Sequence, residues 1–232
     1  MYLQLSGRVA TILADYANPG SLGHQMRVRR LSPLLGMIDE VHALRGNVRL
    51  VDVGGTEAYW TMLPRDYLNT RDVTITIVDL PGTPMPSDHD RFEFVPADGC
   101  RLDMFEDRTF DIAHSNSVIE HVGDQGRMVA FAREIVRVAP RYFVQTPDYW
   151  FPVEPHFMAP FFHWLPKSMR VWFFFHAGVG FWGKRATREE AISVVESVHL
   201  LDRRALQALF ADACIVRERF LGLPKSLIAT KP

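Results

Sequence analysis

Short apolar runs alternate with amphipathic segments along most of the chain. β-Branched or aromatic residues crowd five of these runs, at 48–53, 73–78, 92–95, 110–115 and 141–146. Short runs of this composition, bounded by turn residues, are typical of buried strands. Other segments repeat apolar residues every three or four positions, which predicts helices at 57–67, 124–138, 187–198 and 202–210. Strands that alternate with helices indicate an α/β fold.

The two ends of the chain extend this pattern. Residues 1–46 are predicted to be helical, in two segments separated by the break at Asn18-Pro19-Gly20. The second segment carries Arg27, Arg29 and Arg30, which either form a solvated face or reach an anionic group of a ligand. Near the other end, 214–221 and 225–230 are predicted to be strands joined by a Gly-Leu-Pro turn.

Size and composition favour one domain without a nucleic-acid partner. The chain has 232 residues, of which 47% are hydrophobic, and its net charge is −1. A single α/β domain of residues 1–232 is therefore expected. The two cysteines, Cys100 and Cys214, lie far apart and fit a reduced, cytoplasmic protein. The sequence has neither a signal-type apolar start nor a run of about 20 apolar residues, so no transmembrane segment is predicted.

A glycine turn follows the first predicted strand. Asp52 stands near the strand's end, and Gly54, Gly55 and Thr56 follow it directly. A strand, a glycine turn and a helix form the context in which backbone can approach a nucleotide-like ligand. A carboxylate beside the turn would repel a pyrophosphate but suits a ligand that carries an ammonium and a sulfonium. The turn therefore favours S-adenosylmethionine over a dinucleotide.

Acids also follow the next two predicted strands. Asp79 ends the second strand, at about the distance from Gly54 that is expected for the ribose-binding acid of a nucleotide-binding βαβ unit. A carboxylate there can accept hydrogen bonds from both ribose hydroxyls. Asp98 and Gly99 follow the third strand. The alternative is that both acids are turn or capping residues.

The stretch Asp52–Gly55 resembles motif I of the class I S-adenosylmethionine-dependent methyltransferases, and Thr56-Glu57-Ala58 replaces the usual later glycine. The run F-D-I-A-H-S-N-S-V-I-E-H-V, at 110–122, resembles their motif IV. The resemblance implies a Rossmann-like fold with a seven-stranded, mostly parallel sheet, an antiparallel last strand and helices on both faces. It also implies binding of S-adenosylmethionine, with Asp79 on the ribose and Leu80 on the adenine. By the same resemblance, Asp98 and Gly99 meet the adenine edge, and Ser115 and Asn116 line the methionine end.

The resemblance divides the domain into four parts. Residues 1–46 are a helical cap, 47–146 are the cofactor-binding core, and 187–232 supply the last helices and the strand pair. Residues 147–186 have no counterpart and concentrate ten aromatics between Phe157 and Trp182. This insertion is expected either to pack as a helical cap, to cover an apolar acceptor, to make peripheral contact with a membrane or to form a homodimer contact.

Two histidines are candidates for a general base. His121 follows the fourth strand, and His156 follows the fifth strand with Glu154 placed to orient its imidazole. Either could deprotonate an acceptor, although each could instead be a loop residue. His, Cys, Asp and Glu show no convincing metal-ligand spacing, so no metal site is predicted.

These observations favour an enzyme that transfers a methyl group from S-adenosylmethionine to a small molecule by in-line displacement. The leaving group departs neutral, so the protein mainly supplies proximity and alignment. One alternative is a methyltransferase-like protein that binds without catalysis. A nicotinamide-dependent oxidoreductase is disfavoured, because the turn lacks the G-x-G-x-x-G spacing.

Overall fold

The computed structural model describes residues 27–232. The helix predicted around Val9, Ile12 and Leu13 lies outside the described residues, as does the start of the second predicted segment. The described part of that segment contains α3 (Ser32–Arg45), which ends at Gly46 with a left-handed backbone.

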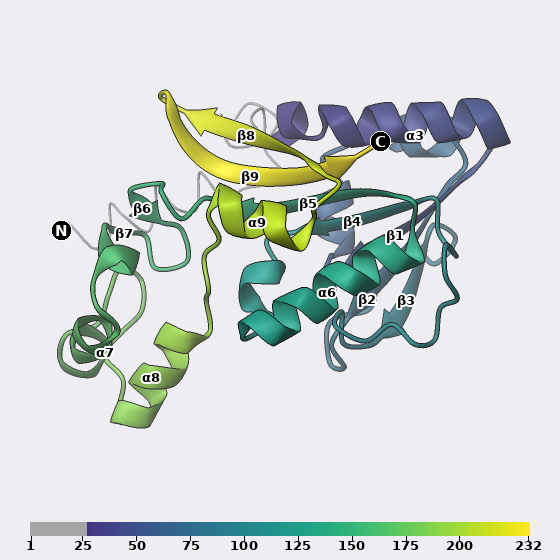
Figure 1. Ribbon diagram of the computed structural model, residues 1–232. Helices are drawn as coiled ribbons and strands as arrows, with labels where there is room; N and C mark the ends of the chain where they lie inside the picture. The colour runs from purple at the N-terminus through teal and green to yellow at the C-terminus, as the bar shows by residue number, and fades with distance from the viewer. Residues whose placement is uncertain (1–26) are drawn as a thin grey trace.

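A seven-stranded sheet forms the centre of the molecule (Figure 1). Its strands are β1 (Val48–Val53), β2 (Val73–Asp79), β3 (Phe92–Pro96), β4 (Ile112–Asn116), β5 (Arg141–Pro147), β8 (Cys214–Phe220) and β9 (Leu223–Lys231). The strand order is β3-β2-β1-β4-β5-β9-β8, and β9 runs antiparallel to both of its neighbours. This arrangement confirms the predicted Rossmann-like fold, including the antiparallel last strand.

Helices cover both faces of the sheet because side chains alternate along its buried strands. Val51 and Val53 point into one apolar cluster, which also contains residues of α6 (Gln125–Val138) and α9 (Arg203–Leu209). Val48 and Leu50 point into the other, together with residues of α3. The strand between these layers is buried along nearly its whole length, which is typical of a parallel sheet with two covered faces.

The single helix predicted at 57–67 is wrong. The structure has two short helices, α4 (Glu57–Trp60) and α5 (Arg65–Thr70), and Pro64 is the N-cap of the second. Proline lacks a backbone N–H and cannot continue a helix through its own position. The apolar spacing of this segment instead places Tyr59, Trp60 and Leu68 in the same cluster beneath the sheet.

Residues 147–198 project from the core as a separate lobe, which we call the aromatic lobe (Figure 1). It contains β6 (Val153–Glu154), β7 (Ala159–Pro160), η2 (Phe162–Trp164), α7 (Lys167–His176) and α8 (Arg188–Glu196). The predicted helix at 187–198 was assigned to the C-terminal part of the domain. In the structure it is α8, and it packs against α7 in the lobe. Its buried residues join the lobe's own apolar cluster of Phe157, Phe162, Val171, Phe174, Val179, Ala191 and Val195.

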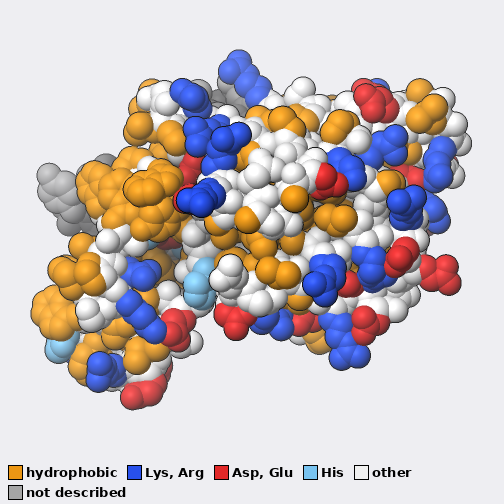
Figure 2. Space-filling model, viewed as in Figure 1, with side chains coloured by type: hydrophobic (Ala, Val, Ile, Leu, Met, Phe, Trp, Pro, Cys, Tyr) orange, Lys and Arg blue, Asp and Glu red, His pale blue; other side chains and the backbone are white. Residues whose placement is uncertain are grey.

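The ten aromatics between Phe157 and Trp182 divide into three groups, of which the half-buried one consists of Phe173 and Phe175. Three of them, Phe157, Phe162 and Phe174, are buried in the lobe's cluster. Five remain exposed, namely Phe161, Trp164, Trp172, Phe181 and Trp182. Figure 2 shows hydrophobic side chains gathered over the lobe, whereas charged groups are spread over the core. Within residues 27–232, no helix combines the length and apolar character needed to cross a membrane.

Candidate cofactor and acceptor site

The glycine turn after β1 has a backbone that requires its glycines. Gly54 has φ +74°, and a Cβ atom there would lie 2.5 Å from Cγ2 of Val118. A Cβ atom on Gly55 would lie 1.8 Å from Oδ2 of Asp52. Both glycines are therefore needed for a left-handed turn that runs directly over the Asp52 carboxylate. The N–H of Gly54 donates to the carbonyl of Val78 at 2.7 Å, which fixes the turn against β2.

Asp52 lies beneath this turn and not on its surface. Its side chain is fully buried, Oδ2 accepts from Nε1 of Trp60 at 2.8 Å, and Oδ1 lies 2.6 Å from Nδ1 of His114. Nε2 of His114 is 3.2 Å from the Tyr59 hydroxyl, which completes a buried polar network. The expectation that the Asp52 charge faces the cofactor is therefore corrected. Both oxygens bind protein donors, and the residue supports the turn from below.

Asp79 stands where the second strand ends. It is partly buried, and Oδ1 accepts from the N–H of Leu80 at 2.7 Å. Leu80 is 58% exposed, so its side chain is available to a ligand. Thr56 is exposed at the start of α4, and its side chain makes no capping hydrogen bond there. These three residues lie at one edge of the sheet because β1 and β2 run parallel in register.

Asp98 and Gly99 follow β3 at the same edge. Asp98 accepts from Nη2 of Arg127 at 2.7 Å and from the N–H of Cys100 at 2.9 Å. Burial opposes the charge on Asp98, but these two bonds outweigh it and hold the pKa of the carboxyl below its usual range. A Cβ atom on Gly99 would lie 2.6 Å from Cγ1 of Val53, so this glycine lets the loop pack onto β1. Arg127 is a neighbour that the sequence motifs did not indicate.

Ser115 and Asn116 end β4 at the centre of the edge. Ser115 is fully buried and donates to the carbonyl of Val53 at 2.9 Å, so its hydroxyl joins β4 to β1. Asn116 is more accessible, and its Oδ1 accepts from Nη1 of Arg30 at 3.4 Å. The Arg30 side chain is 9% exposed and lies 3.7 Å from Glu218. Arg30 is therefore a buried cation beside Asn116, and not part of a solvated face.

The structure brings His121 and His156 together. Their Nε2 atoms lie 3.0 Å apart, although the residues come from η1 (Ile119–His121) and from the turn between β6 and β7. Glu154 Oε1 lies 2.7 Å from Nδ1 of His156, which is the orienting contact that the sequence predicted. The other His121 nitrogen, Nδ1, lies 3.0 Å from the carbonyl oxygen of Ser197.

Glu120 is the member of this group that the sequence did not single out. It is fully buried, and Oε2 accepts from the hydroxyl of Thr146 at 2.9 Å. Burial raises the pKa of its carboxyl to about 7. Burial also lowers the pKa of His121. For His156, burial disfavours the charged form, but the bond to Glu154 and the nearby carboxylates outweigh it and raise the pKa.

Comparison with known proteins identifies the core. Residues 52–141 match the family described as "Methyltransferase domain". An uncharacterized protein of Mycobacterium tuberculosis strain H37Rv, Rv1509, is 33% identical over 69 residues, which are 30% of this chain and 24% of that protein. The uncharacterized protein MT1557 of Mycobacterium tuberculosis strain CDC 1551 / Oshkosh matches to the same extent. The chain thus spans about a quarter of the length of these curated relatives.

Solved structures with similar folds are more distant in sequence. "PigF with SAH" is 13% identical with a TM-score of 0.49, and the match covers 90% of this chain and 64% of that one. An O-methyltransferase family protein from Burkholderia thailandensis is 16% identical with a TM-score of 0.48, covering 99% of this chain and 69% of that one. Residues 52–141 thus match a methyltransferase-domain family, and the strand order of the sheet is that of the Rossmann-like fold.

Proposed function

We propose that this chain binds S-adenosylmethionine at the carboxyl edge of β1 to β4 and transfers its methyl group to a small-molecule acceptor. The observation that carries the proposal is the left-handed turn at Gly54, with Asp79 and Asp98 at the ends of the next two strands. Open α/β sheets bind ligands at this edge. The family match over residues 52–141 supports the same chemistry.

Each part of the cofactor has candidate binding residues at this edge. In this proposal, Asp79 binds the ribose hydroxyls, Leu80 contacts one face of the adenine, and Asp98 with Gly99 contacts its edge. Near β4, Asn116 and the buried Arg30 lie where the methionine end would reach. A guanidinium there can pair with the methionine carboxylate.

The acceptor is placed on the side of the aromatic lobe. His121 and His156 follow β4 and β5, and Nε1 of Trp182 donates to the carbonyl of His156 at 3.1 Å. An exposed aromatic beside two imidazoles suits an acceptor with an apolar part and an ionisable hydroxyl or amine. Either imidazole can take the acceptor's proton, and in-line alignment with the sulfonium supplies the rest of the catalysis.

Binding of S-adenosylhomocysteine to Gly54→Val tests the cofactor site. The valine would meet Val118 and force a left-handed backbone on a β-branched residue, so titration calorimetry should find no binding. Gly46→Val is the matched control, because Gly46 has φ +80° with nothing within 4 Å of its Cβ position. It imposes the same backbone strain far from the site and should leave affinity unchanged. Normal binding by Gly54→Val would refute the cofactor site.

The alternative of binding without catalysis needs a separate experiment. Cell extract is incubated with the protein and methyl-labelled S-adenosylmethionine, and labelled small molecules are sought by mass spectrometry. The expected product is a labelled compound that appears with the wild-type chain and not with Gly54→Val. If the wild type binds the cofactor but labels nothing, the chain is a binding protein and the catalytic part of the proposal fails.

A further inference from the structure

Three potential metal ligands converge between the core and the aromatic lobe. Glu120 and His121 come from η1 after β4, and His156 comes from the β6–β7 turn. One ligand atom from each residue lies within 4.8 Å of the other two. The two Nε2 atoms are 3.0 Å apart, and Nε2 of His156 is 3.8 Å from Oε1 of Glu120. The sequence predicted no metal site, because His156 is distant from the other two along the chain.

Hydrogen bonds fix which nitrogen of each histidine faces the cluster centre. Nδ1 of His121 can only donate to the Ser197 carbonyl oxygen, because that oxygen is an acceptor. Nδ1 of His156 likewise donates to Glu154, which is 1% exposed. Each neutral ring therefore directs the lone pair of Nε2 inward. Two lone pairs 3.0 Å apart repel unless a proton or a metal ion lies between them.

Glu120 contributes an oxygen without a partner. Oε1 is buried and has no hydrogen-bond partner, whereas Oε2 binds Thr146. A buried acceptor without a partner is costly and calls for an explanation. Within residues 27–232, the only ion pairs of Glu120 and Glu154 are with His156. Two buried carboxyl groups thus share one imidazole, and a divalent cation would give both of them a second positive partner.

We propose that Glu120 Oε1, His121 Nε2 and His156 Nε2 bind a divalent transition metal ion of the Zn²⁺ type. Two imidazoles and one carboxylate are a donor set that Zn²⁺ uses in catalytic sites, whereas Mg²⁺ and Ca²⁺ prefer oxygen ligands. A tetrahedral Zn²⁺ holds its ligand atoms about 3.3 Å apart, given metal–ligand distances of about 2.0–2.1 Å. The observed 3.0 and 3.8 Å lie on either side of that spacing.

The residues around the cluster orient its ligands as in known metal sites. Metal-bound histidines generally donate their other ring N–H to a carboxylate or a backbone carbonyl, and here Glu154 and Ser197 accept those bonds. Three protein ligands leave the fourth position to an oxygen ligand, and His121 is an exposed residue. Activation of an acceptor hydroxyl at that position would replace proton transfer to a free imidazole and rests on the proposed function, whereas metal binding itself does not.

Metal binding is measured on the full chain without cofactor. The protein is stripped with a chelator, titrated with Zn²⁺ by calorimetry and, separately, loaded with Co²⁺, whose visible absorption reports tetrahedral coordination. We expect one ion per chain for the wild type. Glu120→Gln, His121→Gln and His156→Gln should each lose the Co²⁺ band and weaken Zn²⁺ binding at least a hundredfold. His176→Gln, an exposed histidine of the same lobe, should behave as the wild type.

A further variant distinguishes the ligands from the residues that orient them. Glu154→Gln keeps all three ligands but weakens the orienting bond, so affinity should fall about 10- to 100-fold with the Co²⁺ band retained. Circular dichroism identifies any variant that does not fold. The ligand variants that do fold then decide whether the three residues bind the metal. Absence of Zn²⁺ binding by the wild type, or equal binding by the ligand variants and the wild type, would overturn the proposal. S-adenosylhomocysteine binding is measured in parallel, so failure of the metal site and failure of the cofactor site remain distinct.

Discussion

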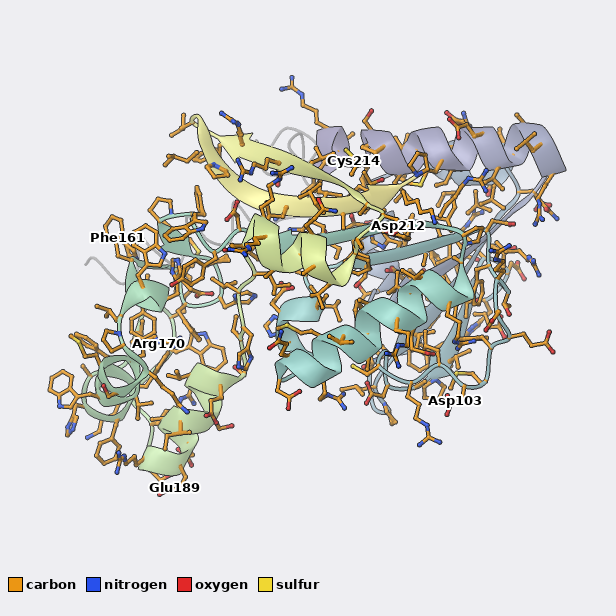
Figure 3. The ribbon with its side chains drawn as sticks, viewed as in Figure 1. Asp103, Phe161, Arg170, Glu189, Asp212 and Cys214 are labelled. Carbon is orange, nitrogen blue, oxygen red and sulfur yellow. The ribbon has the colours of Figure 1, made fainter. Side chains whose placement is uncertain are left out.

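The core and the aromatic lobe use buried residues in different ways. Beneath the glycine turn, the core buries a polar network of Asp52, His114, Tyr59 and Trp60, which fixes one backbone conformation at the ligand edge. The lobe buries three aromatic rings packed edge to face, such as Phe157 against Phe174 at 5.0 Å, together with aliphatic side chains. Figure 3 places Phe161, Arg170 and Glu189 on the lobe, apart from Asp103, Asp212 and Cys214 on the core.

Hydrogen bonds join these two regions at two places. At the first, the N–H groups of Asp148 and Tyr149 donate to the carbonyls of Lys225 and Leu201. The second is η1. The Glu120 carbonyl accepts from the N–H of His199 at 2.8 Å, and His121 bonds to Ser197. The candidate acceptor residues are therefore also part of the connection between lobe and core. The comparison indicates that the core specifies the cofactor, whereas the lobe and its attachment specify the acceptor.

Phe174→Ala should have the largest effect and should confine it to the lobe. Phe174 is fully buried, so truncation should cost about 3–5 kcal/mol of local stability. Hydrogen exchange should accelerate in α7 and α8 while the sheet stays protected. Equal loss of protection in β1 and β4 would mean that lobe and core unfold as one unit.

Asp79→Ala should act only on the core's ligand edge. Loss of the ribose contacts should weaken S-adenosylhomocysteine binding by about 1.5–3 kcal/mol, because bonds to a charged group are lost. The melting temperature should stay near the wild-type value, since within residues 27–232 the Asp79 carboxylate bonds only the adjacent N–H of Leu80. Asp103→Ala is the control for calorimetry, because Asp103 is an exposed acid whose carboxylate pairs with Arg101. Unchanged affinity in Asp79→Ala would contradict the assignment of the ribose site.

Asp52→Asn tests whether the buried network supports the glycine turn. The amide cannot accept from both His114 and Trp60 as the carboxylate does, so unfolding free energy should fall by about 1–3 kcal/mol. Cofactor affinity should fall as well, because the turn lies directly over this side chain. Denaturant unfolding and calorimetry measure the two effects. Loss of affinity with full stability would restore Asp52 as a direct cofactor ligand.

Trp182→Ala should have the smallest effect. We expect it to change only the kinetics with the acceptor. An exposed ring beside His156 should raise the acceptor KM about tenfold, equivalent to about 1.4 kcal/mol, with cofactor affinity unchanged. Phe161→Ala is the matched control, because Phe161 is an exposed aromatic of the same lobe that makes no contact with His156. Steady-state kinetics should leave that variant at the wild-type KM. Equal KM values for both variants would place the acceptor elsewhere.

Most of the sheet could be predicted because its strands are short apolar runs with clear boundaries. The predicted strand at 48–53 coincides with β1, and the runs at 73–78 and 141–146 fall within β2 and β5. The prediction of one helix at 57–67 was wrong because it followed the apolar spacing and did not take account of Pro64, which separates α4 from α5. The lobe was harder to predict, since an aromatic-rich sequence does not reveal which rings pack together and which stay exposed.

The site could be predicted where its residues follow strand ends, as for Gly54, Asp79 and Asp98. Contacts between distant segments could not be predicted in this way. His114 looked like an ordinary strand residue, and only the register of β4 beside β1 reveals that it faces Asp52. The cluster of Glu120, His121 and His156 depends on how the lobe returns to the core, which no local spacing indicates. A glutamate directly before His121 was the one signal that could have directed attention there.

The position of β9 has a consequence for how the protein is made. β9 follows β8 in the sequence, yet it lies between β5 and β8 in the sheet. During synthesis, β8 therefore leaves the ribosome before the strand that attaches it to the other strands. Until Leu223–Lys231 emerges, β5 presents an unpaired edge of the kind that promotes aggregation. This interval is when the nascent chain has most need of a chaperone.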